Sequence, residues 1–284
     1  MNPRENPETI KLFERLAAWT WSIIPLAAEE KISWGEQTLT EHLLLAIKLA
    51  GLCNVRVRQK PLSANGQESK TGLDWEWWIG SPGEWWRFAV QAKKLDWSER
   101  RYTKLNHKVD KEPQHEILER YATDNLAIPL YCLYNHVAKF VPQGHWRCCC
   151  EPPEIEQFGC TVTGLDNVKE ALKTRSARTF DYFLRQTDTY PWRCLVKCPN
   201  KLRNLVAKRY GDKYQPLKQL PAEIERLRVG LAADDSDEPR ENQLETHFQP
   251  GKIIARRLMV VTIAEEQDSP AQISQLRPLP RFQK

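Results

Sequence analysis

Several features that define large protein classes are missing from this chain of 284 residues. No apolar run approaches the roughly 20 residues that a membrane-spanning helix needs. The first ten residues, MNPRENPETI, are polar and contain no signal-peptide core, so we expect a cytoplasmic protein with no membrane partner. We find no internal repeat, P-loop, dinucleotide fingerprint or Gly-x-Ser-x-Gly motif. This excludes the enzyme classes that these motifs mark.

The chain also lacks the C-x2-C pairing that is typical of structural zinc sites, although it contains eight cysteines. Without a secretion signal, these cysteines are expected to be reduced thiols. His145, Cys148, Cys149, Cys150 and Cys160 gather in one stretch and raise the question of a zinc site. We prefer the simpler interpretation of small buried side chains and a loop with free thiols.

The composition is that of a folded globular protein, with 41% hydrophobic residues and 11 tryptophans. The length allows one sizeable domain, or one domain with an appendage. The net charge of +5 is compatible with a polyanionic partner. It does not establish one, because many basic proteins bind no polyanion.

The stretch Thr71–Lys94 has the pattern of a β-hairpin that is rich in tryptophan. Two runs of alternating apolar and polar residues flank a turn signal at Gly80–Glu84. If Ile79 pairs with Trp86, residues opposite each other and residues two apart share a face. One face then carries polar groups, namely Asp74, Glu76, Gln91 and Lys93. The other face is apolar, with Trp75, Trp77, Phe88, Val90 and Ala92.

Polar side chains on a largely apolar hairpin indicate a binding function, because burying them without a partner is costly. The oxygens of Asp74 and Gln91 are hard ligands of the kind that Mg²⁺ or Mn²⁺ takes, alongside water and phosphate. Lys93 can steady a phosphate oxygen or hold the attacking water. These groups together suit metal-assisted phosphodiester hydrolysis.

These residues resemble a known family. The run Gly72-Leu73-Asp74-Trp75-Glu76-Trp77-Trp78, followed by Val90-Gln91-Ala92-Lys93, is similar to the PD-(D/E)XK nuclease superfamily. It is closest to the Mrr-type branch, in which Gln replaces the motif Glu, and the similarity extends from about the Glu41 helix to about Pro199. The resemblance implies a restriction-endonuclease-like fold and a role in bacterial defence. It also implies that Asp74 and Lys93 are the motif residues, and that Gln91 departs from the superfamily consensus.

Three further residues are candidates for the site, and two of them also have a structural interpretation. Glu41 stands three residues after Thr38, the spacing of a capping box, and could cap its own helix. The resemblance instead makes it a residue that reaches the metal, and the two roles are compatible. Glu76 is either an extra ligand or a half-exposed strand residue, and Arg87 on the same face could pair with it. Gln114 opens a predicted helix and is an auxiliary candidate for the site.

Two basic segments with interleaved aromatic residues are candidates for contacting nucleic acid, since basic side chains neutralise phosphates and aromatic rings stack on bases. The first, Lys93–Lys111, adjoins the motif lysine, and the second is Lys197–Lys218. The side chains that we expect to contact nucleic acid are Lys94, Arg100, Arg101, Lys104, Lys208 and Arg209. As isolated charge runs, both segments would more simply be solvated loops.

Hydrophobic periodicity predicts an α/β fold with a mixed central sheet flanked by helices and a C-terminal extension. We expect a packing helix within residues 1–35 and a catalytic core over residues 36–200. A basic extension with a strand at Gly251–Glu265, at the sheet edge or paired with a partner chain, covers residues 201–266. Residues 267–284 form a proline-containing, loosely ordered tail.

The sequence therefore predicts a Mg²⁺- or Mn²⁺-dependent nuclease, with DNA favoured as substrate and a homodimer conceivable. Asp74, Gln91 and Glu41 would hold the metal, and Lys93 would complete the catalytic set. The main alternative is a catalytically inactive module of the same fold that binds nucleic acid or docks an effector. A protein-interaction scaffold is a third interpretation.

Overall fold

The computed structural model describes residues 6–59, 71–137, 148, 154–198, 201, 203, 205–206, 215–230 and 255–263. The helices are α1 (Pro7–Glu29), α2 (Glu36–Ala50), α4 (Gln114–Asp124), α5 (Leu165–Leu172), α6 (Phe180–Leu184), α7 (Cys194–Lys197) and α9 (Ala222–Arg228), with 3-10 turns η1 (Ile155–Gly159) and η2 (Arg175–Ala177). The strands are β1 (Val55–Gln59), β2 (Trp75–Ser81), β3 (Glu84–Lys94), β4 (Lys108–Val109), β5 (Glu112–Pro113), β6 (Ile128–Tyr134), β7 (Cys160–Gly164), β8 (Tyr190–Pro191) and β9 (Arg257–Thr262).

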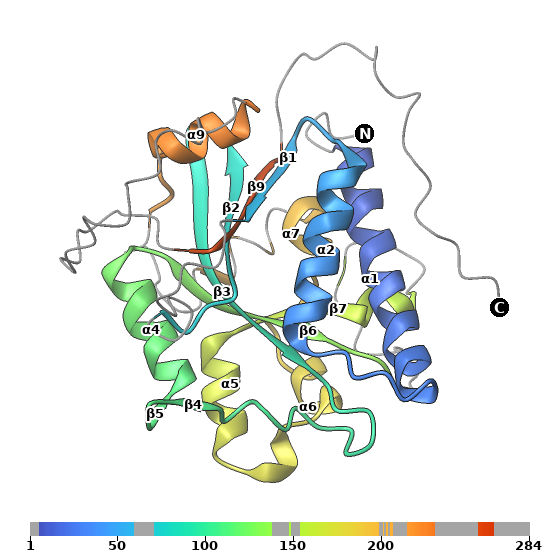
Figure 1. The fold of residues 1–284 in the computed structure, drawn as a ribbon. Helices are drawn as coiled ribbons and strands as arrows, with labels where there is room; N and C mark the ends of the chain where they lie inside the picture. Colours follow the sequence, from blue (N-terminus) through green and yellow to red (C-terminus); the bar gives the residue numbers. More distant parts are fainter. Residues whose placement is uncertain are drawn as a thin grey trace, which may run out of the picture.

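A seven-stranded mixed sheet of order β1-β9-β2-β3-β6-β7-β8 forms the centre of the molecule (Figure 1). β2 and β3 are antiparallel, whereas β2 with β9 and β3 with β6 are parallel. The small strands β4 and β5 pair separately. The predicted mixed α/β architecture is confirmed. Among the described residues, no helix is long and apolar enough to cross a membrane.

The predicted hairpin is confirmed in its register. Ile79 pairs with Trp86, and Glu76 lies opposite Ala89. The turn is tighter than the sequence suggested, because Ser81 still pairs with Glu84 and only two residues, Pro82 and Gly83, connect the strands. Gly83 has φ +88°, a conformation that glycine adopts without strain.

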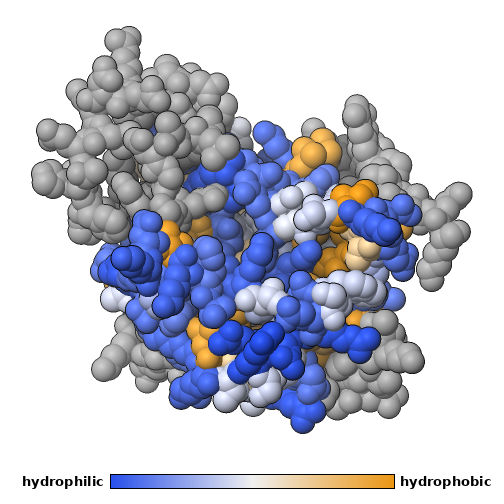
Figure 2. All heavy atoms as spheres, turned by 60° about the horizontal axis from the view of Figure 1, so that its bottom comes forward, coloured by the Kyte–Doolittle hydropathy of each residue, from blue (hydrophilic) through white to orange (hydrophobic). Residues whose placement is uncertain are grey.

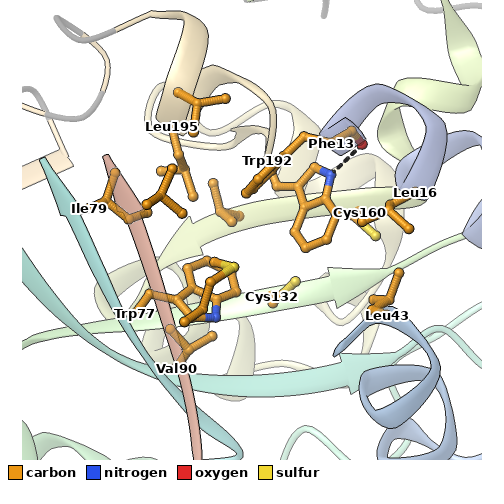
Figure 3. Close-up of a cluster of buried hydrophobic side chains, with 14 of the residues drawn as sticks. Phe13, Leu16, Leu43, Trp77, Ile79, Val90, Cys132, Cys160, Trp192 and Leu195 are labelled. Carbon is orange, nitrogen blue, oxygen red and sulfur yellow. Dashed lines mark hydrogen bonds between the residues drawn. The ribbon is translucent and has the colours of Figure 1, made fainter. Parts of the chain in front are cut away.

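The alternation of side chains along the hairpin separates two hydrophobic cores, one on each face of the sheet. Trp75, Trp77 and Val90 join the core beneath α1, α2 and α7. Trp78 and Ala89 join the core on the opposite face, beneath α4 and α5. Figure 3 shows the first core, where side chains of the helices meet those of the strands and Trp192 Nε1 donates to Phe13 O at 2.8 Å.

The N-terminal helices begin and end at residues whose chemistry suits those positions. Asn6 caps α1 by accepting a hydrogen bond from Thr9 N at 3.2 Å, and Pro7 occupies the first turn. α2 ends at Gly51 with φ 65°, a left-handed conformation that glycine commonly adopts at the end of a helix. The predicted capping box is wrong: α2 begins at Glu36 after Gly35, so Glu41 lies inside the helix and does not cap it.

The C-terminal strand is not at an edge of the sheet, contrary to the expectation from its sequence. β9 lies between β1 and β2, antiparallel to the first and parallel to the second. All six of its residues are buried. The strand of the expected extension is therefore part of the central sheet, whereas residues 267–284 lie outside the described part of the chain.

Candidate metal and nucleic-acid site

Asp74 and Gln91 are in contact, as the predicted register requires. Gln91 Nε2 donates a hydrogen bond to Asp74 Oδ2, and Ala92 N donates to the same oxygen at 2.7 Å. The backbone of Asp74 is fixed as well, since its N–H donates to Val90 O at 2.8 Å. The aspartate at the start of β2 is thus held against the end of β3 by both its side chain and its backbone.

The Gln91 carbonyl oxygen is the unusual atom of this site. Gln91 is 2% exposed, and its Oε1 has no hydrogen-bond partner among the described residues. The orientation of the amide follows from its surroundings, because Nε2 donates to both Asp74 and Ala92 O, the latter at 3.1 Å. A buried carbonyl oxygen without a donor is costly, so an unfilled acceptor beside a carboxylate is what a cation or an ordered water would satisfy.

Lys93 lies on the same face and is almost fully buried, with 5% of its surface exposed. Its Nζ donates a hydrogen bond of 2.7 Å to Oε1 of Gln114, and Gln114 is the first residue of α4. Burial lowers the pKa of Lys93 below its ordinary value, although the charges of Asp74 and Glu36 oppose this effect. Gln114, an auxiliary candidate from the sequence, therefore contacts the motif lysine directly.

Glu36 is a site residue that the sequence reasoning missed. It is the first residue of α2, and its Oε1 accepts from Lys94 N at 3.4 Å while its Oε2 lies 3.6 Å from Lys104 Nζ. Its charge also acts on Lys93. Gly35 was the sequence signal that could have revealed it, because a glycine before a predicted helix indicates where the helix begins. The helix begins directly after Gly35, which puts Glu36 at the helix N-terminus, near the end of β3.

Glu41, the residue expected to reach the metal, is held by arginines at the start of β9. Its Oε1 lies 3.0 Å from Arg257 Nη2 and 3.7 Å from Arg256 Nη2. Burial alone would raise the pKa of Glu41, but hydrogen bonds from Gln37 and Arg257 hold the pKa below its ordinary value. Arg257 also donates to the backbone carbonyl of Asp74 at 3.2 Å. Arg257 thus lies between Glu41 and the backbone of Asp74.

Glu76 forms a buried ion pair, which corrects the expectation of a half-exposed residue. The Glu76 side chain is 0% exposed, and its Oε2 lies 2.9 Å from Arg87 Nη2. Tyr121 donates to the same oxygen at 2.9 Å, and Trp78 Nε1 donates to Oε1 at 2.7 Å. Burial alone would lower the pKa of Arg87, but the Glu76 charge raises it. The predicted pairing of Arg87 with a carboxylate is confirmed, and the Glu76 oxygens are engaged by protein donors.

The family model DUF6615, described as a family of unknown function, matches residues 9–269. The chain belongs to the DUF6615 family. Searches of curated proteins and of solved structures found no match. The matched range of this DUF6615 chain includes both the hairpin and β9, so the central sheet lies within the family's extent.

The first basic segment of this DUF6615 protein leaves β3 and forms one wall of a cleft. A cavity of about 350 Å³ is lined by Glu99, Arg101, Tyr102, Thr103, Asn106, Arg175 and Arg178. Arg101 is the predicted member, whereas Arg175 and Arg178 follow α5 and had no signal in the sequence. Figure 2 brings this end of the molecule forward and shows a mostly hydrophilic surface.

The other predicted nucleic-acid contacts of the DUF6615 chain differ in their availability. Arg100 is exposed, and Lys104 is 66% exposed although it approaches Glu36. Lys94 is partly buried, and its Nζ donates to the Trp34 carbonyl at 2.5 Å. Lys208 and Arg209 lie outside the described residues.

Three basic residues in the described part of the second segment make contacts within the protein. Arg203 makes two hydrogen bonds to Glu84, at 2.9 and 2.8 Å, and Lys197 lies 4.0 Å from Glu14. Lys201 Nζ lies over the Tyr190 ring, 5.0 Å from its centre. The described part of this segment therefore contributes less available charge than its sequence suggests. In the cleft after β3, Arg175 Nη2 also lies 3.2 Å from Glu99 Oε2, but the Arg175 side chain stays 74% exposed.

Proposed function

We propose that this DUF6615 protein is a metal-dependent nuclease that hydrolyses phosphodiester bonds in nucleic acid, with DNA as the favoured substrate. The observation that carries the proposal is the buried, unsatisfied carbonyl oxygen of Gln91, which lies beside the Asp74 carboxylate. Lys93 follows two residues later on the same face of the sheet, bonded to Gln114. A hard-oxygen pair next to a buried ammonium fits a divalent cation and a phosphate better than it fits a structural role.

The site residues would have different roles in the reaction. Asp74 and Gln91 would hold the cation, and Ala92 N fixes the Asp74 carboxylate in place by its hydrogen bond. A bound Mg²⁺ or Mn²⁺ would supply Lewis-acid polarisation of the scissile phosphate and a more acidic water. Lys93 would donate a hydrogen bond to the attacking water or to a phosphate oxygen while Gln114 keeps its Nζ in position.

The binding surface for the polyanion would extend from the site along the segment after β3. Arg101, Arg175 and Arg178 line one cleft there, and arginine binds phosphate through several N–H donors at once. Lys104 is exposed and bridges towards Glu36 at the start of α2. This arrangement would make affinity fall steeply with salt, because each phosphate contact releases a counterion.

Glu41 is the weakest candidate among the three metal ligands, since Arg256 and Arg257 already engage its carboxylate. Glu36 is an additional carboxylate whose charge acts on Lys93. We infer that α2 contributes to the site through Glu36, while Glu41 holds Arg257 against the Asp74 carbonyl.

A catalytically inactive nucleic-acid-binding module is the second candidate function. It is favoured by the direct contact between Gln91 and Asp74, in which the neutral amide satisfies part of the carboxylate without any cation. In that case the basic cleft would bind nucleic acid and the polar face would serve only the fold.

Cleavage assays separate the two functions. The full chain is incubated with plasmid DNA and with RNA in Mg²⁺, Mn²⁺ or chelator, alongside Asp74→Asn and Lys93→Ala. Asp124→Asn and Lys48→Ala change matching residues at exposed positions of α4 and α2 and serve as controls. The proposal predicts metal-dependent cleavage that both site variants lose and both controls keep. Binding without cleavage under all metal conditions would support the inactive module instead.

A further inference from the structure

Three cysteines from two distant parts of the chain meet on the α7 side of the sheet. The Sγ atoms of Cys148, Cys194 and Cys198 all lie within 4.8 Å of one another. Cys148 is partly buried, Cys194 and Cys198 are buried, and none is in a disulfide. Cys160, which the sequence grouped with Cys148, lies elsewhere and donates to Thr20 Oγ1 at 3.3 Å.

We propose that Cys148, Cys194 and Cys198 hold a structural zinc ion, separate from the Asp74 site and independent of the proposed nuclease function. Zinc prefers thiolates, and sites with three cysteines and a fourth ligand are an established structural type. The sequence did not reveal the site because its motif is C-x3-C, with the third cysteine far upstream. His145, Cys149 and Cys150, the neighbours of Cys148 in the sequence, lie outside the described residues.

The geometry of the cluster suits a tetrahedral ion. Zn–S bonds of about 2.3 Å at a tetrahedral angle place the sulfurs about 3.8 Å apart. Cys148 Sγ and Cys198 Sγ are 4.0 Å apart, and Cys194 Sγ lies within 4.8 Å of both. Cys194 and Cys198 are one helical turn apart, so the first residue of α7 and the residue that follows the helix can present both sulfurs on one side.

The surrounding contacts show what the ion would stabilise. Cys198 N donates to Cys194 O at 3.0 Å, so the backbone between the two ligands is a closed turn. Cys194, Leu195 and Val196 belong to the core that also contains Trp192 and the residues of α1. Zinc would fasten Cys148, which belongs to the connection between β6 and η1, onto this core. A helix of four residues has little stability alone, so an ion bound at its two ends would stabilise it.

A disulfide and a set of buried apolar thiols are the alternatives to a metal ion. A disulfide would join two of the three sulfurs and give the third no role. Buried thiols need no mutual contact: Cys132 is fully buried in the same core without belonging to the cluster. Thiols can also meet through S–H···S hydrogen bonds, and Cys148 Sγ and Cys198 Sγ are within that distance. A metal ion engages all three sulfurs, and the metal content of the protein separates the two cases.

The test is the metal content of the purified full-length protein, expressed with zinc and dialysed against metal-free buffer. Elemental analysis should give about one zinc per chain, and a cobalt-substituted sample should show thiolate-to-cobalt charge-transfer absorption. Cys194→Ser/Cys198→Ser should lose the zinc, whereas Cys53→Ser, at an exposed cysteine, and Asp74→Asn should both keep it.

The wild-type protein decides the matter even if the double variant fails to fold. X-ray absorption at the zinc edge of the wild type should count three or four sulfur ligands. Zinc-free protein that is folded with all thiols reduced, a disulfide among the three found by mass spectrometry, or a zinc with fewer than three sulfur ligands would each overturn the proposal.

Discussion

Lys93 and Gln114 are joined by a hydrogen bond of 2.7 Å that connects the end of β3 to the first residue of α4. The ammonium is almost fully buried, so this amide oxygen takes the place of water as its acceptor. The bond therefore fixes where the positive charge of the site stands. Under the proposed function, Gln114 would be a positioning residue whose role can be separated from that of Lys93.

Changing Gln114 should alter the pH dependence of cleavage. In Gln114→Glu a carboxylate faces Lys93 Nζ, which raises the pKa of Lys93 and moves the alkaline limb of the activity profile to higher pH. In Gln114→Leu the acceptor is lost, so the limb moves to lower pH and the rate falls by up to about 100-fold. A pH profile of single-turnover cleavage measures both. Identical profiles for the two variants would show that Gln114 does not position Lys93.

Removing the buried charge of Lys93 should stabilise the fold and abolish the proposed activity. Burial holds the pKa of Lys93 below its ordinary value of 10.5, so the unfolded chain binds a proton more tightly than the folded chain does. Wild-type stability therefore increases as pH rises from the folded pKa towards 10.5, and the charge is a cost below that range. Lys93→Met should be more stable than wild type at pH 7, with the difference shrinking at alkaline pH.

Urea unfolding at several pH values tests this expectation, with Lys48→Met on the exposed side of α2 as the control. The control should show no such pH-dependent difference. If Lys93→Met were less stable than wild type at pH 7, the contacts of the ammonium would outweigh its burial, and the lysine would be a structural residue.

The two glutamates of α2 should behave differently. Glu36 acts electrostatically on Lys93, whereas Glu41 is engaged by Arg256 and Arg257. Glu36→Gln should lower the pKa of Lys93 further and shift the alkaline limb of activity downward. Glu41→Gln should leave that limb in place. Comparison of the two pH profiles tests this difference. A loss of metal affinity in Glu41→Gln but not in Glu36→Gln would show that Glu41 is a metal ligand after all.

The buried pair of Glu76 and Arg87 should contribute to stability and not to metal binding. Breaking it from one side, with Glu76→Gln or Arg87→Met, should cost about 3–5 kcal/mol, because the remaining charge is left buried without its partner. The double variant should be less destabilised than the sum of the single variants. Arg185→Ala, which breaks an exposed pair with Asp181, should have little effect on stability.

Chemical denaturation measures these differences, and Mn²⁺ titration of the folded Glu76→Gln protein completes the test. Wild-type affinity for Mn²⁺ is expected. A large drop in affinity would mean that Glu76 is a ligand, and that its hydrogen bonds to Tyr121 and Trp78 are those of a metal-free state only.

The hairpin could be predicted because its determinants are local. Period-2 alternation and a Pro-Gly turn fix which residues face each other, so the meeting of Asp74 with Gln91 follows from the register. The helix that carries Glu41 and the helix that opens at Gln114 could be located for the same reason, since each has its own periodicity. The packing of these elements against one another depends on contacts between them. The short turn of the hairpin depends on such contacts as well.

Long-range placement could not be predicted from the sequence. Arg257 at the start of β9 stands 183 residues after Asp74, and no local pattern specifies that β9 inserts between β1 and β2. For the same reason, the sequence could not predict three other long-range neighbours. These are Arg257 beside Glu41, Arg175 in the basic cleft, and Cys194 beside Cys148. Glu36 was missed because the helix begins two residues before the apparent capping box.

The central claim is that Asp74 and Gln91 bind a divalent cation, and calorimetric titration of the full-length protein with Mn²⁺ tests it most directly. The protein is first checked for zinc, so that the cysteine cluster does not contribute heat. We expect one saturable Mn²⁺ site in the wild type, strongly weakened in Asp74→Asn and weakened less in Gln91→Leu, with Asp124→Asn unchanged. No saturable binding in the wild type, or equal binding in wild type and Asp74→Asn, would contradict the metal-dependent mechanism.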